Sequence, residues 1–561
     1  MDAPDTYQAV PDIPDYGLLR DLLADALAKH ADMVAFSCDG AKLTYRELDR
    51  LSDAIAAWLL RESTLMPGDR VAIQLPNLLQ YPITALGVIK AGMVIVNINP
   101  LYTAGETEHQ LIDSGARALV TLEEVLPVTS KILAGTAIEK VIVTRATEFH
   151  PWHLRLAYRF SQWLRRRKPA AIRFSARVEF EQVLKKGKRY LRFMRMPALA
   201  ELSPEKLGHQ ESGHLSLIQY TGGTTGIAKG AMLSDGNIIA NMLQLDLAIG
   251  DHSPPPGSVI VAPLPFYHIY AFTLNFAYSI YKGYHGVLIP DPRNTDRLVN
   301  TLKRHRINGI VGVSTLYNVL CRHPEFRKLD FSGLDVCTSG GMALSVPTAR
   351  RWEKLTGCRI LEGYGLTETS PLVASGCYSD YQEGKIGRAT KWTELRIVDE
   401  AGNIAPPGEA GEIQVRGPQV MLGYWRRPEE TADILTIDGW LSTGDVGVID
   451  ASGYLTIVDR IKDLILVSGF NVYPAEIEDL VVRHPDIREA AAIGVPKEEG
   501  EQVKLFVISE NPDLTEEEVI QFCRQGLAPY KVPSRVEFRA TLPRTNVGKI
   551  LRRQLREDQV A

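Results

Sequence analysis

The sequence predicts an α/β fold with a large N-terminal domain of layered, mostly parallel sheets plus a β module, and a small, mobile α+β C-terminal domain. Three observations predict it. Segments with helical spacing alternate with short apolar runs from residue 16 onward, short strands split by turn pairs follow residue 388, and the alternation resumes after residue 460. A chain of 561 residues has room for two to four such units.

The first hundred residues set the pattern. LLRDLLADALAKHA and YRELDRLSDAIAAWLL have helical spacing, whereas DRVAIQLPN and AGMVIVNINP are short apolar runs that end in Pro or Asn. Further buried strands are expected at ARALVT, KVIVTR, GSVIVAPLP, YHGVLIP, INGIVGVST and LDVCTSGG. Because ligands sit at the carboxyl ends of parallel strands, the turns after these runs are the places to look for a site.

A basic insertion interrupts the pattern at residues 152–196. From His153 to Met196 there are fourteen Lys and Arg residues against two acidic ones, a local net charge of +12. One helical face in its first part carries Trp152, Leu156, Phe160, Trp163 and Leu164, and four basic residues follow at 165–168. Such a face predicts peripheral contact with an anionic membrane, with a surface insertion packed on its own domain as the alternative.

The predicted domains follow from these changes of pattern. Residues 1–458 are expected to form the large domain, within which 388–458 is an antiparallel β module. Residues 459–462 are expected to be a hinge, and residues 463–561 have the length of a small C-terminal domain.

Charge and cysteine usage narrow the class of protein. The net charge of −4 gives no overall basic field, so we expect no nucleic-acid partner. Six scattered cysteines without metal-ligand spacing favour a reduced interior, and the acidic N-terminus lacks the pattern of a secretion signal. The longest apolar run, 82–96, is too short to span a bilayer. We therefore expect a cytoplasmic protein that reaches at most the inner membrane face, as a monomer or a homodimer.

The strongest local signal is a glycine- and threonine-rich loop after an apolar strand, LSLIQYTGGTTGIAKGA at 215–231. Glycines allow backbone N–H groups to close around phosphate oxygens, threonines add donors, and a lysine adds positive charge. The loop is not a Walker motif, because Lys229 follows Ala228 and precedes Gly230. The string predicts a triphosphate-binding loop.

This loop resembles the phosphate loop of the adenylate-forming superfamily, which includes acyl-CoA synthetases, luciferases and the adenylation domains of peptide synthetases. Five more motifs follow in the family's order: GGMAL at 340–344, EGYGLTETS at 362–370, STGD at 442–445, DRIKDLILVSGFNVYPAEIE at 459–478 and PRTNVGKI at 543–550. DGWLSTGD and SGFNVYPAEIE are most similar to the long-chain fatty-acid–CoA ligase branch. The resemblance implies ATP, Mg²⁺ and coenzyme A.

The resemblance assigns roles to individual positions. It implies a nucleotide site at Thr221, Gly222, Gly223, Thr224, Thr225, Gly226, Lys229, Gly341, Met342, Tyr364, Gly365, Thr367, Asp445 and Arg460. It implies Mg²⁺ at Glu368 and Thr224, and catalytic roles for Lys549, Glu368 and His268. It also implies a pivot at Lys462 that withdraws Lys549 after the first half-reaction and brings the loop of Gly469 to the CoA side.

The segment after the phosphate loop indicates the acyl group. Residues 263–270, PLPFYHIY, are aromatic and lack the acidic residue that amino-acid-activating relatives use, which favours an apolar acyl chain. Tyr267, His268 and Phe272 are therefore the expected acyl pocket, although His268 also fits a core position among aromatics. Phe272 lies near where some long-chain relatives carry a gating Trp, a departure that leaves chain length open.

The acceptor is inferred from the end of the sequence. Twelve residues follow Lys549, with no carrier domain among them, so the expected acceptor is diffusible CoA. The expected reaction forms acyl-AMP and pyrophosphate from ATP and a fatty acid, and then acyl-CoA and AMP. The alternatives are a medium-chain or aryl acid CoA ligase, an acyl-AMP ligase that loads a carrier protein, and a nucleotide-binding regulatory protein without catalysis.

Overall fold

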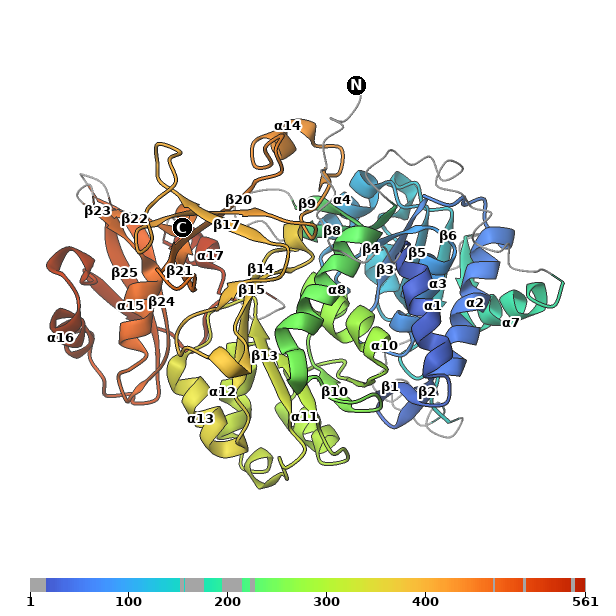
Figure 1. Cartoon of the computed structure of the whole chain (residues 1–561), viewed down its shortest axis with the longest axis horizontal. Helices are drawn as coiled ribbons and strands as arrows, with labels where there is room; N and C mark the ends of the chain where they lie inside the picture. The colour runs from blue at the N-terminus through green and yellow to red at the C-terminus, as the bar shows by residue number, and fades with distance from the viewer. Residues whose placement is uncertain are drawn as a thin grey trace.

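Two large sheets, a four-stranded antiparallel sheet and a small C-terminal unit make up the chain in the computed structural model (Figure 1). The structure describes residues 17–151, 156, 176–193, 214–221, 228–467, 470–497, 501–545 and 550–559. In Figure 1 the C-terminal unit lies at one end of the long axis and the N-terminal half of the large domain at the other.

The first large sheet has nine strands, and its central six, from β14 to β1, run parallel. In spatial order the strands are β16 (Arg388–Ala389), β15 (Leu372–Ser375), β14 (Ile360–Gly365), β13 (Val336–Gly340), β12 (Gly309–Gly312), β10 (Val259–Ala262), β11 (His285–Leu288), β1 (Val34–Cys38) and β2 (Ala41–Thr44). β10 to β13 are short, largely buried runs, as expected where helices cover both faces.

The second large sheet has eight strands, and six of these, from β8 to β7, run parallel. In spatial order they are β19 (Gly423–Tyr424), β9 (Lys229–Ser234), β8 (Leu215–Thr221), β4 (Val94–Asn97), β3 (Arg70–Gln74), β5 (Ala118–Leu122), β6 (Lys140–Thr144) and β7 (Arg177–Glu179). β9 and β19 are antiparallel additions at one edge.

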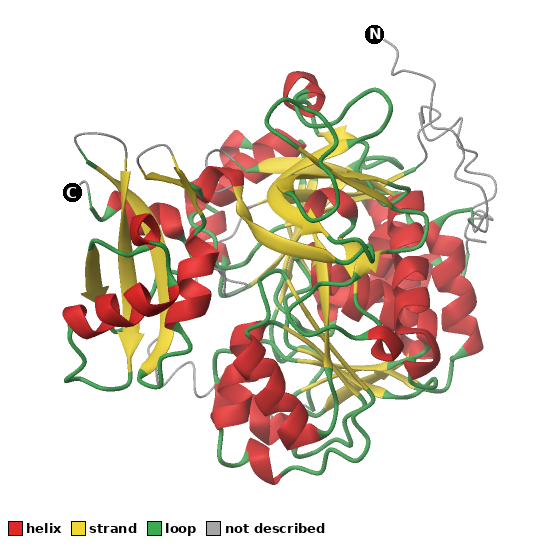
Figure 2. Cartoon of the chain, turned by 60° about the vertical axis from the view of Figure 1, so that its left-hand side comes forward, coloured by secondary structure: helices red, strands yellow, loops and turns green. Residues whose placement is uncertain are grey.

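Helices pack around and between these sheets (Figure 2). In the large domain they are α1 (Leu19–Lys29), α2 (Tyr45–Glu62), α3 (Gln80–Lys90), α4 (Ala104–Ser114), α5 (Leu126–Thr129), α7 (Phe180–Tyr190), α8 (Asp235–Ile249), α9 (Ile269–Ala271), the π-helix η5 (Phe272–Tyr278), α10 (Ser279–Lys282), α11 (Thr295–Leu302), α12 (Ser314–Arg322), α13 (Val346–Thr356) and α14 (Pro428–Ala432). α2, α4 and α8 begin with capping boxes at Thr44, Thr103 and Ser234, which satisfy their first backbone N–H groups.

The β module is a four-stranded antiparallel sheet in the order β17 (Glu394–Val398), β18 (Ala410–Arg416), β20 (Leu441–Ile449) and β21 (Leu455–Arg460). Two short strands within the expected module belong elsewhere, because β16 pairs with β15 and β19 pairs with β9. These pairings tie the module to both large sheets.

The C-terminal unit has its own core. It comprises β22 (Ile465–Val467), β23 (Phe470–Val472), α15 (Pro474–Val481), β24 (Ile487–Pro496), β25 (Glu501–Ser509), α16 (Glu516–Gly526), β26 (Arg535–Phe538) and α17 (Arg552–Glu557). Ile477, Val481, Leu505 and Val519 are fully buried in a cluster that is separate from the large-domain core. The predicted α/β class, with parallel-rich sheets and a separate C-terminal unit, is confirmed.

Three further expectations from the sequence can be compared with the structure. No helix within the described ranges is long and apolar enough to cross a membrane. All six cysteines are free thiols. The helix expected from residue 152 to 168 lies outside the described residues, apart from Leu156.

Candidate functional site

A buried carboxylate, a guanidinium and a phenol meet where the β module contacts the nine-stranded sheet. Asp445 on β20 stands opposite Arg460 on β21, and its Oδ1 lies 2.9 Å from Nε of Arg460. The hydroxyl of Tyr364, on β14, donates to Oδ2 of Asp445 at 2.8 Å. Burial, reinforced by the Asp445 charge, raises the pKa of Tyr364, so the phenol stays a neutral donor. Three residues from separate motifs therefore form one cluster.

The two ends of the phosphate loop also meet. Thr221 ends β8 and stands opposite Lys229 at the start of β9, so the chain leaves and returns at one point. Gly222, Gly223, Thr224, Thr225 and Gly226, between them, lie outside the described residues. The strand pairing thus fixes where the loop begins and ends.

Tyr424 links Lys229 to Glu368. Nζ of Lys229 lies 5.1 Å from the centre of the Tyr424 ring, and the Tyr424 hydroxyl donates to Oε1 of Glu368 at 2.7 Å. Nζ of Lys229 also lies 3.5 Å from Oε2 of Glu430. Tyr424 reaches this place because β19 pairs with β9, and burial followed by the Glu368 charge raises its pKa. The phosphate-loop lysine and the expected Mg²⁺ ligand are neighbours.

At two motif positions the backbone geometry favours glycine. Gly341, after β13, has a φ of +80°, which favours glycine, and Met342 beside it packs against the large core. A Cβ at Gly365 would overlap the carbonyl oxygen of Pro371. Thr367, Glu368 and Thr369 then form a single 3₁₀ turn. The EGYGLTETS string therefore turns sharply beside the Asp445 cluster.

Buried amides hold the aromatic segment 263–270. Nδ2 of Asn77 donates to the carbonyls of Ala262 and Leu264 at 2.9 and 2.7 Å, and Nε2 of Gln219 donates to the carbonyl of Tyr267 at 2.9 Å. His268 caps α9, with Nδ1 accepting from the backbone N–H of Tyr270 at 3.3 Å. The segment is thus anchored to β8, beside the phosphate loop.

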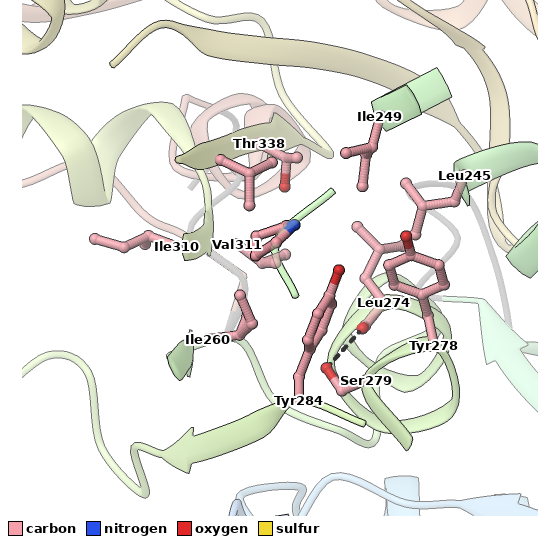
Figure 3. Close-up of a pocket in the computed structure, with 12 residues that line it drawn as sticks. Leu245, Ile249, Ile260, Leu274, Tyr278, Ser279, Tyr284, Ile310, Val311 and Thr338 are labelled. Atoms are coloured by element: carbon pink, nitrogen blue, oxygen red, sulfur yellow. Dashed lines mark hydrogen bonds between the residues drawn. The ribbon is translucent and has the colours of Figure 1, made fainter. Parts of the chain in front are cut away.

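Two adjoining apolar cavities lie between the nine-stranded sheet, α8 and η5. The first is lined by Leu245, Ile249, Pro254, Ile260, Leu274, Tyr278, Ser279, Tyr284, Ile310, Val311, Val336 and Thr338 (Figure 3). The second is lined by Leu245, Ala248, Ile249, Tyr270, Leu274, Thr338, Ser339, Leu361, Gly363, Leu372 and Ser375. Four shared residues join them, and Gly363 places the second cavity next to Tyr364.

The residues expected to form the acyl pocket lie outside the linings of these two cavities. Neither cavity lining includes Tyr267, His268 or Phe272. Phe272 is fully buried and packs on Phe276 with ring centres 5.1 Å apart, and burial raises the pKa of Tyr267. The cavities instead use Tyr270 and Leu274, on the same helical stretch.

Lys462, the predicted pivot, lies close to the Asp445 cluster. Lys462 lies on the 3₁₀ turn 461–463, and desolvation together with the Arg460 charge lowers its pKa, against the opposing charges of Asp463, Asp445 and Glu368. Lys462 therefore lies close enough to Asp445 and Glu368 to interact with them electrostatically. Gly469 and Lys549 lie outside the described residues, although Arg544 and Ile550, near the two ends of the last motif, pair as an antiparallel bridge.

Some residues of the site carried no sequence signal. Tyr424 stands in a Gly-Tyr-Trp string that matches no motif used above, and the cavity residues come from many separate strands and helices. Within the described residues, no three His, Cys, Asp or Glu side chains gather as a metal site. Glu368, the expected Mg²⁺ ligand, therefore belongs to no such group of described residues.

Comparison with known proteins decides the family. The family model described as AMP-binding enzyme matches residues 23–425, and that of the AMP-binding enzyme C-terminal domain matches residues 476–549. The chain belongs to the AMP-binding enzyme family. The gap between the two matches, residues 426–475, contains β20 and β21 of the β module and the turn with Lys462.

Two curated relatives of this AMP-binding enzyme carry the same name. The long-chain-fatty-acid–CoA ligase of Escherichia coli O6:H1 is 45% identical over 99% of this chain and 95% of its own length. That of Haemophilus influenzae is 44% identical over 98% of this chain and 96% of its own length. Among solved structures, ATP-bound MatB from Rhodopseudomonas palustris aligns with a TM-score of 0.80 at 28% identity, covering 97% of this chain and 99% of its own.

Proposed function

We propose that this AMP-binding enzyme is a long-chain fatty-acid–CoA ligase. It would join a fatty acid to ATP as acyl-AMP with release of pyrophosphate, and then transfer the acyl group to coenzyme A with release of AMP. Relatives that bear this name at 44–45% identity over nearly the whole chain support the proposal.

The observation that carries the proposal is the junction of an apolar cavity with the Tyr364 cluster. Gly363 lines the second cavity, and the next residue, Tyr364, holds Asp445. An acyl chain in the cavity would therefore have its carboxylate beside the groups expected to bind adenosine. Apolar pockets with few polar groups are typical sites for such ligands.

The first step would place charge where this cluster can neutralise it. The fatty-acid carboxylate oxygen attacks the α-phosphorus of ATP, a P–O bond forms, and pyrophosphate leaves. Asp445 would accept from the ribose hydroxyls, and Lys229 with the phosphate-loop amides would bind the leaving phosphates. Glu368 would hold Mg²⁺, which supplies positive charge to the triphosphate. Lys549 would neutralise the reacting carboxylate and α-phosphate.

The second step would need the CoA thiolate near the position that Lys549 occupies in the first step. The CoA thiolate attacks the acyl carbonyl, a thioester forms, and AMP leaves. We propose that the chain pivots at Lys462, so that Lys549 withdraws and the loop of Gly469 approaches the CoA side. The short connection between β21 and β22, residues 461–464, supports such a pivot because few residues join the two units.

Pyrophosphate release and acyl-CoA formation test the proposal together. Laurate, palmitate and coumarate are assayed with and without CoA. Palmitate-dependent pyrophosphate release followed by CoA-dependent thioester supports it. A preference for coumarate would instead indicate an aryl acid ligase, and acyl-AMP that CoA does not consume would indicate loading of a carrier protein.

Lys549→Ala tests the assigned catalytic lysine. The variant should lose acyl-AMP formation yet still convert supplied acyl-AMP and CoA to thioester. Lys497→Ala, an exposed lysine of the same unit, should leave both half-reactions unchanged. Full acyl-AMP formation in Lys549→Ala would remove the role assigned to Lys549.

We also propose a cytoplasmic enzyme that touches anionic membrane through the insertion at 152–196. In its described part, α7 exposes Lys185, Lys188 and Arg189, and Phe193 just beyond is 83% exposed. Each basic residue near an anionic surface contributes about 1 kcal/mol. Co-sedimentation with phosphatidylglycerol vesicles should therefore occur at low salt and weaken as salt rises, whereas absence of binding at low salt would exclude this contact.

A further inference from the structure

The apolar cavities end at two tyrosines. Tyr278, the last residue of η5, and Tyr284, just before β11, line the first cavity, and neither lines the second (Figure 3). Their rings are 6.0 Å apart at a 75° angle. They lie at the end of the paired cavities away from Gly363, and so away from the nucleotide cluster.

Hydrogen bonds fix both phenols. Tyr284 shares a 2.9 Å hydrogen bond with the hydroxyl of Ser253, and Tyr278 donates to Oδ1 of Asp246 at 2.8 Å. Nζ of Lys282 lies 2.6 Å from the same oxygen. Burial raises the pKa of both tyrosines, so both remain neutral.

The backbone beneath these rings is also held. The buried hydroxyl of Tyr45 donates to the carbonyls of Ser279 and Tyr284 at 3.0 and 2.7 Å. An alkyl chain that pushed past the rings would leave these polar groups unpaired, at about 1–3 kcal/mol for each. The tyrosines therefore form a rigid floor with a polar rim.

The span between the nucleotide end and this floor suits a long acyl chain. From Gly363 to Ile260 the lining crosses β14, β13, β12 and β10, which are three neighbouring steps in the sheet. At about 4.8 Å a step this is roughly 14 Å. An extended alkyl chain advances about 1.25 Å per methylene, from C–C bonds of about 1.5 Å at tetrahedral angles. In length, this span corresponds to about a dozen methylenes.

We propose that Tyr284, braced by Tyr278, sets the upper limit of acyl-chain length. This inference rests on the proposed function, because it takes the paired cavities as the acyl site. Tyr284 is a specificity-determining residue in this scheme and takes no part in either chemical step.

The test is the chain-length profile of kcat/KM for saturated acids from C10 to C20 with the full-length enzyme. Tyr284→Ala removes a ring about 5 Å long, so the fall-off at long chains should move outward by about four carbons. Val311→Phe, which fills the first cavity from β12, should move it inward. Tyr281→Ala, at a tyrosine of α10 that lies outside both linings, should keep the wild-type profile.

The two opposite shifts keep the inference falsifiable if Tyr284→Ala fails to fold, since Val311→Phe then tests the same cavity alone. Wild-type profiles in both folded variants would overturn the floor while leaving the proposed function intact. Failure of the wild-type enzyme to make any fatty acyl-CoA would instead overturn the proposed function.

Discussion

At the scale of residues, the polar side chains of the candidate site form hydrogen bonds and ion pairs with one another in the ligand-free chain. Asp445 accepts from both Tyr364 and Arg460, and Glu368 accepts from Tyr424. Buried polar groups without partners are costly, so these pairings hold each carboxylate in one orientation in the folded chain. Ligand binding then requires exchange of a hydrogen bond rather than reorganisation of the backbone.

Tyr424→Phe tests this organisation at Glu368. The phenyl ring keeps its contact with Lys229, but Glu368 loses a donor and gains freedom to turn away. We expect acyl-AMP formation to fall about tenfold, equivalent to about 1.4 kcal/mol. Pyrophosphate release at several Mg²⁺ concentrations measures it.

Tyr190→Phe is the matched control for that variant. It removes a tyrosine hydroxyl that donates to a glutamate, Glu62, on the contact between α7 and α2. Its activity should equal that of the wild type. Equal losses in the two variants would show that the effect at Tyr424 is a general one and not a property of Glu368.

The sequence made the motif residues of the site predictable and left others out of reach. Asp445, Arg460 and Tyr364 stand in strings whose spacing is informative, and the structure brings these three together. Tyr424 enters only because β19 pairs with β9, and Ile260 and Val311 line a cavity only because β10 and β12 are neighbours. Long-range strand pairing of this kind leaves no local pattern.

At the scale of elements, the contact between α7 and α2 depends on one glycine. Gly187 of α7 lies against the backbone of α2, where a Cβ would overlap the carbonyl oxygen of Ala54. Phe180, Val183 and Leu184 complete the buried face of α7. The described part of the basic insertion is therefore packed on its own domain, with its charged face outward.

Gly187→Ala should separate these two helices. Overpacking against a backbone atom costs about 1–3 kcal/mol, so the thermal midpoint should fall. Gly105→Ala, in α4 where a Cβ meets no atom within 4 Å, should leave it unchanged or raise it. Differential scanning calorimetry of the two variants measures the difference, and equal midpoints would show that α7 yields without cost.

The C-terminal unit is held by Arg552 of α17. Its guanidinium bonds Glu478 of α15 at 2.7 and 2.9 Å and lies 3.4 Å from Asp463, next to Lys462. The three side chains are 19%, 16% and 8% exposed, so they are largely desolvated. This cluster ties the segment after the last motif to the proposed pivot.

Arg552→Met should therefore destabilise the C-terminal unit strongly. It leaves the largely buried Glu478 without its cation, which costs about 3–5 kcal/mol, whereas Asp463 keeps Arg556 at 3.2 Å. Arg553→Met, on the neighbouring residue, breaks only an exposed pair with Glu557 and should cost at most about 0.5 kcal/mol. Urea unfolding of the full-length variants distinguishes them, and similar midpoints would contradict the role given to Arg552.

At the scale of the whole molecule, the fold class was predictable because alternating helices and apolar strands have few ways to pack. The assignment of β16 and β19 was not, because two-residue strands have no periodicity to detect. The sequence also showed no pattern for the interactions between the large domain and the C-terminal unit. One of these is the electrostatic repulsion between Glu362 of β14 and Asp479 on α15.

The burial of Glu362 and its repulsion from Asp479 make the free energy of unfolding depend on pH. Burial first, and then the Asp479 charge, raises the pKa of Glu362 to about 7 from its ordinary 4.5, although the backbone N–H of Leu344 donates to it at 2.8 Å. Between these values the folded chain binds more protons at Glu362 than the unfolded chain. The free energy of unfolding should therefore fall as pH rises from about 4.5 to 7, and this contribution is constant above that range.

Glu362→Gln removes the titrating group and keeps an acceptor for Leu344. The variant should gain stability relative to the wild type as pH rises from 5 to 8, by at most roughly 3 kcal/mol at the upper end. Asp479→Asn should shift the balance in the same direction by less, because it removes only the like charge. Thermal midpoints across this range measure the effect, with the exposed Glu409→Gln as control. Parallel curves for wild type and Glu362→Gln would mean that Glu362 has the same pKa in the folded and unfolded chain. In that case neither burial nor Asp479 would shift its pKa.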